Sequence, residues 1–526
     1  MNMRSNIYTI AALVASAFMV TSCFNDLDPK SLGSSIKTSA DVYDSPESYK
    51  EGLAKLYATF ALSGQQGPAG QPDIAGIDEG FGNYLRQLWN CQELTTDEAV
   101  IGWNDATIKD FHWQTWSQTD VFIGAVYSRI MYTVALSNEF IRATTGVEGA
   151  DIKTYNAEAR FLRALAYYHA LDLFGNPPFI TEEDLAGSFF PEQTNRADLF
   201  SYIESELTAI EADLGAPRFE YGRADKAAAW MLQAKLYLNA NVYIGTDKYT
   251  EALTALNKVI GAGYTLSPGY LQNFVADNNT SPEMIFPITS DGLNTQTYGG
   301  MVYLVHAPIG GSMGAVADAM FGVAGGWGGI RVTSAFVDKF DDISGDTDSR
   351  ALFWTDGQTL EIKDIGQFTE GYAMTKYRNR KYDGSPATNA HPDFVDTDWP
   401  MFRLADAYLM YAEAVLRGGQ GGSASEALDL VNAVRERAYG DASGNITSGE
   451  LTLDFILDER ARELYWEGHR RTDLIRFGKF TGGDYVWPWK GNAEEGTSTE
   501  GFRNLFPIPS ADLGANPTLT QNPGYN

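Results

Sequence analysis

Basic residues are scarce in this chain of 526 residues. Lysine and arginine number 39 against 68 acidic residues, which gives a formal net charge of −29. Nucleic acids and anionic lipid surfaces are bound by basic patches, so this balance argues against both and suits a neutral ligand. Aromatic residues, in contrast, make up 13% of the chain, which is unlike a disordered protein.

Catalytic motifs are also scarce. The sequence has five histidines and lacks the H-E-x-x-H motif of zinc proteases. One G-x-S-x-G match, at 310–314, lies in a glycine-rich stretch without the strand and helix that surround this motif in hydrolases. The sequence therefore offers no catalytic signature, and no residue is assigned a catalytic role.

Long apolar runs are absent beyond the N-terminus. There, Arg4 precedes an apolar run at 7–20 and the small-residue sequence VTSC, which ends at Cys23. This order is typical of a secretory signal, and VTSC resembles the cleavage site of a lipoprotein. We therefore predict a lipoprotein signal peptide at 1–22, lipidation of Cys23 and a polar tether at 23–45. The alternative is a plain signal peptide.

Cysteine is nearly absent. Besides Cys23 the chain contains only Cys91, which has no partner if Cys23 carries lipid. The fold must then be stable without disulfide bonds, although export places it in an oxidising compartment. We expect Cys91 to be a small buried hydrophobic residue.

Apolar residues recur at helical spacing in two segments, each about as long as a tetratricopeptide repeat. Residues 223–263 carry two apolar stripes separated by Gly245, and residues 403–438 carry two separated by GGQGG. Alternating alanine with tyrosine and leucine suits the close packing of antiparallel helices. Each segment therefore predicts a helix–turn–helix unit. Further helix pairs are expected from 156–175 with 196–214 and from 45–60 with 121–143.

The fold class that follows is mostly α, with a tetratricopeptide-type helical scaffold at 46–263 and 401–480. Glycine, asparagine, aspartate and threonine dominate residues 264–400, and residues 481–526 are rich in proline and glycine. Such composition predicts loops and short strands inserted into the helical frame.

Several blocks are similar to signature blocks of the SusD/RagB family: EARFLRALAYYHALDLFGNPPFI, FRLADAYLMYAEAV, ILDERARELYWEGHRRTDLIRFGKF and FPIPSADLGANPTLTQNPGY. The resemblance covers nearly the whole chain. It implies a non-catalytic outer-membrane lipoprotein that faces the cell exterior and binds glycan on an irregular half formed by 264–400, 481–526 and loops from 64–118. It also implies a SusC-like TonB-dependent transporter as partner and contact with the membrane only through the lipid anchor.

Segments such as TYGGMVYLV are similar in particular to the starch-binding member of that family, which implies a starch-like α-glucan as ligand. In that member an arc of aromatic rings follows the curve of the glucan. Tyr298 and Trp327 match two of its rings. Trp103 is the candidate for the third, because Ile101 stands where that member has another aromatic residue.

Polar contacts are expected beside these rings. Asn104 is a candidate partner for a sugar hydroxyl, and Asp78 and Arg86 match polar contacts of the starch-binding relative. An alternative for Asp78 and Arg86 is a surface ion pair of little energetic value. The charged run at 458–476 is expected to form structural salt bridges rather than an active site.

The physics of ring stacking predicts weak binding. An aromatic face packs on the apolar face of a pyranose, and each stack contributes roughly 0.5–1.5 kcal/mol by analogy with aromatic pairs. Because association entropy offsets part of three such stacks, we expect a Kd in about the millimolar to high micromolar range. The alternative for Tyr298 and Trp327 is that they anchor glycine-flanked loops to the core. Trp89, Trp113 and Trp116 are expected in the core.

Calcium is the only cofactor for which the sequence offers ligands. Asp396, Asp398, Asp277 and Asn279 supply hard oxygen donors that suit Ca²⁺, and the family resemblance implies structural calcium at matching positions. Other functions stay open: a peptide-binding or other glycan-binding member of the family, a glycoside hydrolase, or a repeat scaffold that binds only protein.

Overall fold

The structure is a computed structural model that describes residues 42–184 and 189–525. The predicted signal peptide, Cys23 and most of the predicted tether lie outside these residues. Residues Glu51–Asn526 form one compact unit, so both the helical and the irregular parts of the chain belong to it. The arrangement below concerns this unit.

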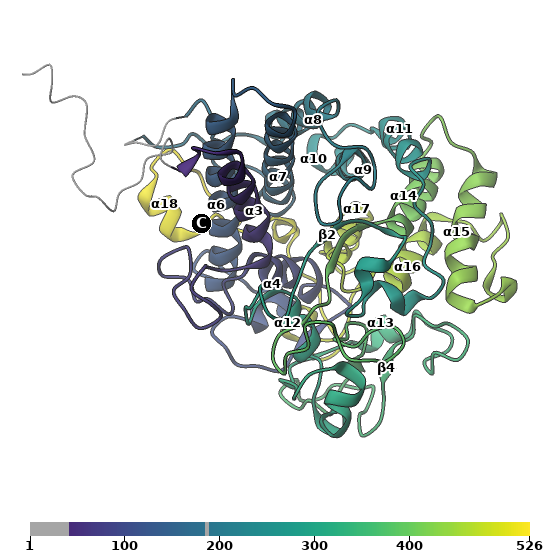
Figure 1. Ribbon diagram of the computed structural model, residues 1–526. Helices are drawn as coiled ribbons and strands as arrows, with labels where there is room; N and C mark the ends of the chain where they lie inside the picture. Colours follow the sequence, from purple (N-terminus) through teal and green to yellow (C-terminus); the bar gives the residue numbers. More distant parts are fainter. Residues whose placement is uncertain (1–41, 185–188, 526) are drawn as a thin grey trace, which may run out of the picture. The chain divides into compact units, whose positions relative to one another are not determined.

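Long helices fill the two regions where helical periodicity predicts them (Figure 1). Their bounds are α3 (Pro46–Ala61), α6 (Val121–Thr144), α7 (Ala150–Phe174), α8 (Arg196–Ile210), α9 (Lys226–Leu238), α10 (Ala240–Ile244), α11 (Tyr249–Ile260), α14 (Leu404–Leu416), α15 (Ala424–Tyr439), α16 (Leu453–Leu464) and α17 (Arg470–Arg476). Neighbouring helices pack as expected: α7 on α8, α9 on α11, and α14 on α15. Because α11 also packs on α14, the two helical regions form one scaffold although 143 residues separate them in sequence.

Side-chain caps define where these helices begin. Asp120 accepts from the backbone N–H groups of Phe122 and Ile123 at the start of α6, and Asp225 does the same at the start of α9. Such caps satisfy backbone donors that have no partner within the helix. Gly175 ends α7 with a φ of 75°, a conformation that glycine adopts without strain.

Two helices differ from their predicted bounds. The helix expected to run to Gly245 breaks at Asn239, whose side chain donates to the Lys235 carbonyl at 2.9 Å and separates α9 from α10. An asparagine that bonds to nearby backbone competes with the helical pattern. The helix expected from Asn156 begins earlier, at the start of α7. The sequence did not indicate these first turns because only Ile152 lies against the core there, so they show no helical period.

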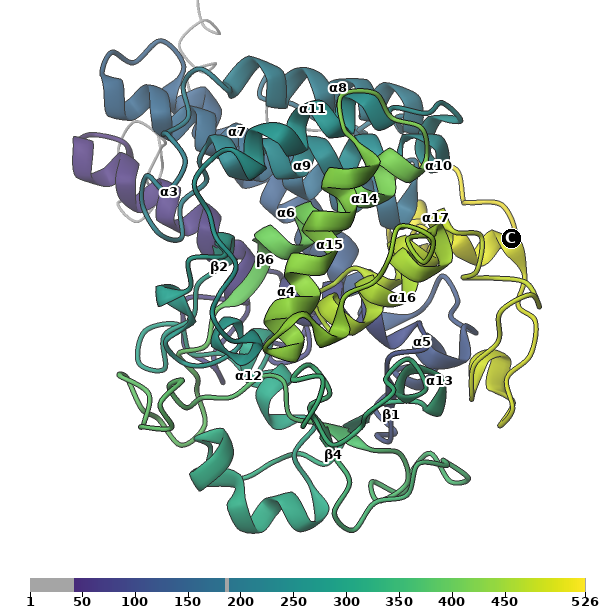
Figure 2. The same cartoon turned by 90° about the vertical axis from the view of Figure 1, so that its right-hand side faces the viewer.

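The remaining segments are short and irregular, as predicted. Their bounds are α4 (Tyr84–Trp89), η1 (Asn90–Leu94), β1 (Val100–Ile101), α5 (Lys109–Trp113), η2 (Tyr270–Asn273), η3 (Asn278–Thr280), β2 (Met284–Ile288), α12 (Gly300–His306), η4 (Gly311–Val316), η5 (Ala317–Phe321), β3 (Ile330–Arg331), α13 (Ser334–Val337), β4 (Phe353–Trp354), β5 (Ala373–Met374), β6 (Trp399–Arg403), η6 (Ala442–Gly444), η7 (Lys490–Asn492), η8 (Gly501–Asn504) and α18 (Ser510–Ala515). The strands form three antiparallel pairs, β1–β3, β2–β6 and β4–β5. Figures 1 and 2 both place α12 and β4 at the end of this unit opposite α8 and α11.

Buried ion pairs join the scaffold to the irregular part. Arg403, the last residue of β6, forms salt bridges with Glu283 (2.7 Å), Glu463 (2.6 Å) and Glu467 (2.5 Å), and all four side chains are almost completely buried. The last two glutamates belong to the charged run at 458–476, so the prediction that this run is structural is confirmed. Buried charges of this kind are costly to leave unpaired, which favours one arrangement of the elements that carry them.

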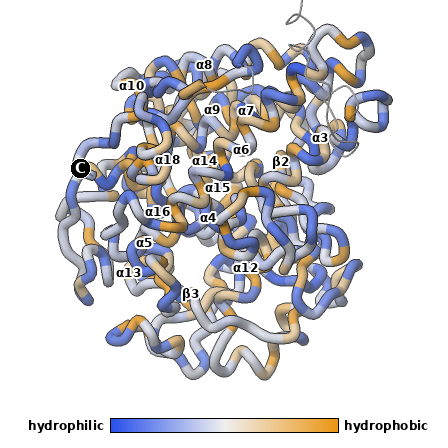
Figure 3. Tube along the Cα trace, turned by 90° about the vertical axis from the view of Figure 1, so that its left-hand side faces the viewer, coloured by the Kyte–Doolittle hydropathy of each residue, from blue (hydrophilic) through white to orange (hydrophobic). Residues whose placement is uncertain are grey.

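The core contains most of the residues expected there. Trp89, Trp116 and Cys91 are buried, whereas Trp113 is only half-buried. Figure 3 shows hydrophobic and hydrophilic stretches alternating along the trace of the helices. Within the described residues no single helix combines the length and apolar character needed to cross a bilayer. One pair of helices, α12 with 311–321, has that length and apolar character together, but it is bent by 111°.

Candidate functional site

A two-residue strand pair brings two of the predicted rings together. In the β1–β3 ladder Ile101 lies opposite Ile330, and the Gly102 N–H donates to the Gly329 carbonyl at 2.9 Å. Trp103 follows at once, and its indole N–H donates to the Trp327 carbonyl at 3.1 Å. The two rings have centroids 6.3 Å apart. Strand register therefore makes neighbours of two tryptophans that lie 224 residues apart in sequence.

A glycine provides the space for Trp103. A Cβ atom on Gly329 would lie 2.3 Å from Cε2 of the Trp103 ring, closer than such atoms can approach. The indole thus packs directly on backbone, and its N–H is already bonded. Because the side chain of Trp103 is only half-buried, part of its ring stays exposed and can contact a ligand.

Helix α12 connects this pair of rings to Tyr298. Tyr298 precedes the helix and is 39% exposed, Tyr303 is buried in its middle, and His306 is its last residue. The seven residues of α12 span about 10 Å at the usual helical rise. The ring of Trp327 stacks on that of His306, with centroids 5.1 Å apart and planes 20° from parallel. Tyr298 and Trp327 are therefore held at opposite ends of one short helix.

Both outer rings have a packed side and an exposed side. Tyr298 contacts Phe394 at a centroid distance of 5.4 Å, and Trp327 is backed by His306. Neither ring is interior to the fold, because Tyr298 is exposed and Trp327 is half-buried. Rings backed in this way lose little conformational entropy when a ligand stacks on them.

Arg86 lies behind the rings, and it forms no ion pair with any residue in 42–184 or 189–525. Its guanidinium carbon is 4.3 Å from the ring centroid of Tyr303 and 5.9 Å from that of Trp103. Nη1 contacts the Gly80 carbonyl at 3.5 Å, and the buried Nε has no hydrogen-bond partner. Burial lowers the pKa of Arg86, although Tyr303 and nearby carboxylates oppose this. Among the residues that the structure describes, this Nη1 contact is the only hydrogen bond of the guanidinium, so most of its donors have no partner there.

Asp78 is exposed and lies near Tyr298. Its carboxylate accepts from the Phe81 N–H at 3.0 Å. A Cβ on Gly80 would lie 3.4 Å from both Asp78 Oδ1 and Tyr298 Cβ, so the two side chains flank this glycine. Within the described residues no salt bridge joins Asp78 to Arg86, which excludes the simple surface pair as their role.

Asn104 follows Trp103 on the exposed side of the chain. Its side-chain oxygen accepts from the Lys109 ammonium at 2.6 Å, which leaves its amide N–H groups available. The structure therefore brings Trp103 into contact with both Trp327 and Arg86, places Asp78 beside Tyr298, and leaves Asn104 at the open edge of the ring pair.

The scaffold fixes the segment that leads into β1. Arg470 of α17 donates to both carboxylate oxygens of Asp97 at 2.7 and 2.6 Å, three residues before β1 begins. Burial alone would raise the pKa of Asp97, but the Arg470 guanidinium brings it down to about 2. This charge-assisted pair anchors the chain just ahead of Trp103.

The predicted calcium ligands have other partners. Asp396 accepts from the backbone N–H groups of Gly292 (2.8 Å) and Asn389 (2.7 Å), and Asp398 accepts from the Ser290 N–H and the Tyr221 hydroxyl. Asp277 accepts from the Tyr382 N–H, and Asn279 is exposed. Within 42–184 and 189–525 no three His, Cys, Asp or Glu side chains are grouped to hold a metal. Calcium binding stays a prediction. It would require these carboxylates to coordinate the ion while they keep their present hydrogen bonds or exchange them for it.

Sequence reasoning did not identify three residues that support the rings: Tyr303, His306 and Phe394. All three are buried, and the first two lie in an apolar stretch that reads as core. Only their contacts with Arg86, Trp327 and Tyr298 connect them to the site. No local sequence pattern could have shown those contacts.

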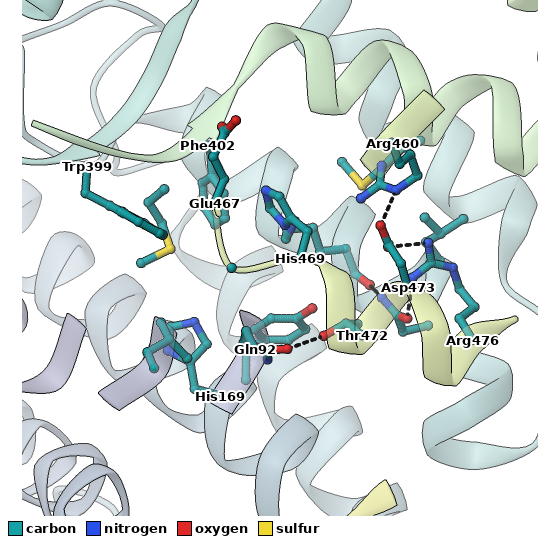
Figure 4. A pocket seen from close by; sticks show the side chains of 18 residues that line it. Gln92, His169, Trp399, Phe402, Arg460, Glu467, His469, Thr472, Asp473 and Arg476 are labelled. Carbon is teal, nitrogen blue, oxygen red and sulfur yellow. Dashed lines mark hydrogen bonds and ion pairs between the residues drawn. The ribbon is translucent and has the colours of Figure 1, made fainter. Parts of the chain in front are cut away.

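A separate cavity lies inside the scaffold, and Figure 4 shows that both polar and apolar side chains line it. His169, Lys235 and His469 contribute to this lining, together with an Arg460–Asp473 salt bridge of 2.7 Å. Counting the positions that the centre of a water molecule can occupy, its volume is about 30 Å³, enough for one or two waters and too small for a sugar. This cavity is part of the buried ionic core.

Known proteins resemble the chain along most of its length. The sequence profile of the SusD family matches residues 347–525. The starch-binding protein SusD of Bacteroides thetaiotaomicron is 36% identical over 99% of this chain and 98% of its own length. Surface glycan-binding protein A of the same species, solved in complex with laminarihexaose, aligns with a TM-score of 0.69 at 21% identity, over 91% of this chain and 99% of that one. The corresponding protein of Bacteroides fluxus aligns with a TM-score of 0.69 at 22% identity, over 91% and 100%.

Proposed function

Because the chain belongs to the SusD family, we propose that it is a non-catalytic cell-surface protein that captures starch-like α-glucan oligosaccharides. Its ligand contacts are the rings of Tyr298, Trp327 and Trp103, assisted by Arg86, Asp78 and Asn104. The names of the relatives above describe binding proteins, which agrees with the scarcity of catalytic motifs.

The observation that carries this proposal is the position of Tyr298, which is exposed, and Trp327, which is half-buried, at the two ends of α12. Each is packed on one side, on Phe394 or on His306, and accessible on the other. Rings that only anchored loops to the core would be buried on both faces, as Trp89 and Trp116 are. The Arg86 Nε is buried, so we assign the contacts of Arg86 with sugar hydroxyls to its Nη groups beside the Trp103 ring.

Isothermal titration with maltoheptaose tests the site. We expect Trp327→Ala to weaken binding by about two- to twelvefold, the range that one stacked ring supplies. Trp230→Ala is the matched control, because Trp230 is a half-buried tryptophan on the scaffold helix α9. Equal affinity of the wild type and Trp327→Ala would remove the proposed site.

The linkage of the glucan is tested separately. Starch is the ligand in the name of the more similar relative, whereas a β-glucan fragment is bound in the structure of a more distant one. Pull-down on insoluble α-1,4, β-1,3 and β-1,4 glucans side by side should retain the protein on the α-1,4 polymer. Retention on β-1,3 glucan alone would reassign the ligand, and binding only to peptide pools would favour a peptide-binding protein.

We further propose that lipid on Cys23 anchors the protein to the outer membrane, facing outward, and that glycan passes to a SusC-like TonB-dependent transporter. The SusD family membership and the N-terminal sequence support this placement. Metabolic labelling with palmitate should mark the wild type and not Cys23→Ser, and affinity purification from the native membrane should recover the transporter. A Cys23→Ser protein that stays labelled would contradict the anchor.

A further inference from the structure

His306, a buried residue behind the proposed site, contacts the main chain through both of its ring nitrogens. It is the last residue of α12, and only 3% of its side chain is exposed. Its Nδ1 lies 2.7 Å from the Gly325 carbonyl oxygen, and its Nε2 lies 3.0 Å from the Asp393 carbonyl oxygen. Both nitrogens of a buried imidazole thus face main-chain acceptors.

The two acceptors belong to two different loops, and each loop carries or supports one of the exposed rings. Gly325 lies two residues before Trp327, whose own N–H donates to the His306 carbonyl at 2.9 Å. Asp393 precedes Phe394, the residue on which Tyr298 packs. The Ala324 N–H also donates to the Pro392 carbonyl at 2.9 Å, so the two loops touch beside the imidazole.

The ring of His306 also sets the plane of Trp327. The imidazole and indole are stacked, with centroids 5.1 Å apart. The hydrogen bond that the ring N–H donates in the plane of the imidazole fixes its orientation, and the stacked indole follows that orientation. One side chain thereby contacts the loop of Trp327, the ring of Trp327 and the loop that supports Tyr298.

We propose that His306 is a positioning residue that sets the separation and tilt of Trp327 relative to Tyr298, so that one oligosaccharide can contact both rings. This inference rests on the proposed function. It predicts a selective effect: loss of His306 weakens binding of an oligosaccharide long enough to reach both rings and leaves unchanged the binding of a short sugar that contacts one.

Three substitutions separate the contacts. His306→Phe keeps a flat ring under Trp327 and removes the hydrogen bond that the imidazole N–H donates. His306→Asn places an amide donor near the position of Nδ1, and His306→Gln places one near the position of Nε2. Burial lowers the pKa of His306, so the ring is neutral at pH 7 and has one N–H to donate. One of the two amide variants should therefore restore what His306→Phe loses.

Fluorine NMR on protein labelled with 5-fluorotryptophan tests the positioning without any ligand. The Trp327 resonance is assigned from its absence in Trp327→Phe. We expect it to shift or broaden in His306→Phe and to return toward the wild-type position in one amide variant, while the Trp230 resonance stays in place. An unchanged Trp327 resonance in His306→Phe would overturn the proposal. If His306→Phe does not fold, the comparison of His306→Asn with His306→Gln decides, and Trp327 resonances at the wild-type position in both would also overturn it.

Titration with maltoheptaose and with maltose tests the selectivity, with laminarihexaose and laminaribiose in parallel. We expect His306→Phe to bind the long ligand about two- to twelvefold more weakly, the range for losing contact with one stacked ring, and to bind the disaccharide like the wild type. His169→Gln, a buried histidine on α7, is the control and should bind both like the wild type. Equal losses for both ligands would overturn the proposal. Trp327→Ala distinguishes failure of the glycan site from failure of the His306 proposal. If Trp327→Ala binds like the wild type, the proposed glycan site is wrong. If Trp327→Ala binds weakly and His306→Phe binds like the wild type, only the role of His306 is wrong.

Discussion

Replacing Gly329 by alanine tests directly whether Trp103 belongs to the binding surface. The new Cβ would lie 2.3 Å from Cε2 and 2.6 Å from Nε1 of the Trp103 ring, so the ring must move. Gly329 does not have a positive φ, so alanine does not strain the backbone there. The substitution thus displaces one ring without deleting any side chain.

The magnitude follows from what the displaced ring loses. Moving the indole breaks its 3.1 Å hydrogen bond to the Trp327 carbonyl, which costs about 0.5–1.5 kcal/mol of stability. A ligand loses one stacked ring, roughly 0.5–1.5 kcal/mol of binding free energy, or about two- to twelvefold in Kd. The melting temperature of so large a protein should fall by about 2 °C or less.

The assay compares Gly329→Ala with Gly325→Ala in the same loop. A Cβ on Gly325 meets no atom within 4 Å, and its backbone conformation also permits alanine. We expect isothermal titration with maltoheptaose to show weaker binding for Gly329→Ala and wild-type binding for Gly325→Ala. Adding Gly329→Ala to Trp103→Ala should change nothing further, because both act through the same ring. Full affinity in Gly329→Ala, or additive losses in the double variant, would refute the reasoning.

Three further predictions concern stability. Arg470→Met leaves Asp97 buried and without its cation, and it should lower the free energy of unfolding by about 3–5 kcal/mol in urea titration. The control Lys153→Met, which removes an exposed ion pair, should lower it by about 1 kcal/mol or less. Equal losses in the two variants would contradict the structural role of the buried pair. Burial, followed by the charge of Glu93, raises the pKa of the Glu98 carboxyl, so the stability it contributes is present below its unfolded pKa of about 4.3 and is lost as pH rises through the folded pKa. Glu98→Gln should therefore raise the melting temperature relative to wild type more at pH 8 than at pH 5, and the same difference at both pH values would count against this. If calcium binds at Asp398, adding Ca²⁺ to chelator-treated protein raises the melting temperature of the wild type and not of Asp398→Asn; no effect on the wild type would end that prediction.

The family and the helical architecture could be predicted from the sequence because their signals are local. Apolar periodicity and capping residues such as Asp120 and Asp225 depend only on near neighbours. The charged run at 458–476 could be predicted to form structural salt bridges because so many arginines and carboxylates lie close together in the sequence. The break at Asn239 was missed because a single side-chain bond to the backbone decided it.

The candidate rings could be named from the sequence, but their arrangement could not. Trp103 and Trp327 are neighbours only because β1 and β3 pair in one register, 224 residues apart in sequence. The contact of Arg86 with Tyr303, and the two main-chain contacts of His306, likewise depend on the position of α12. The sequence alone determined which residues could face a sugar, because residue type fixes chemistry. The tertiary structure decided which of them share a surface and what holds them there, because long-range strand pairing and side-chain packing leave no local pattern in the chain.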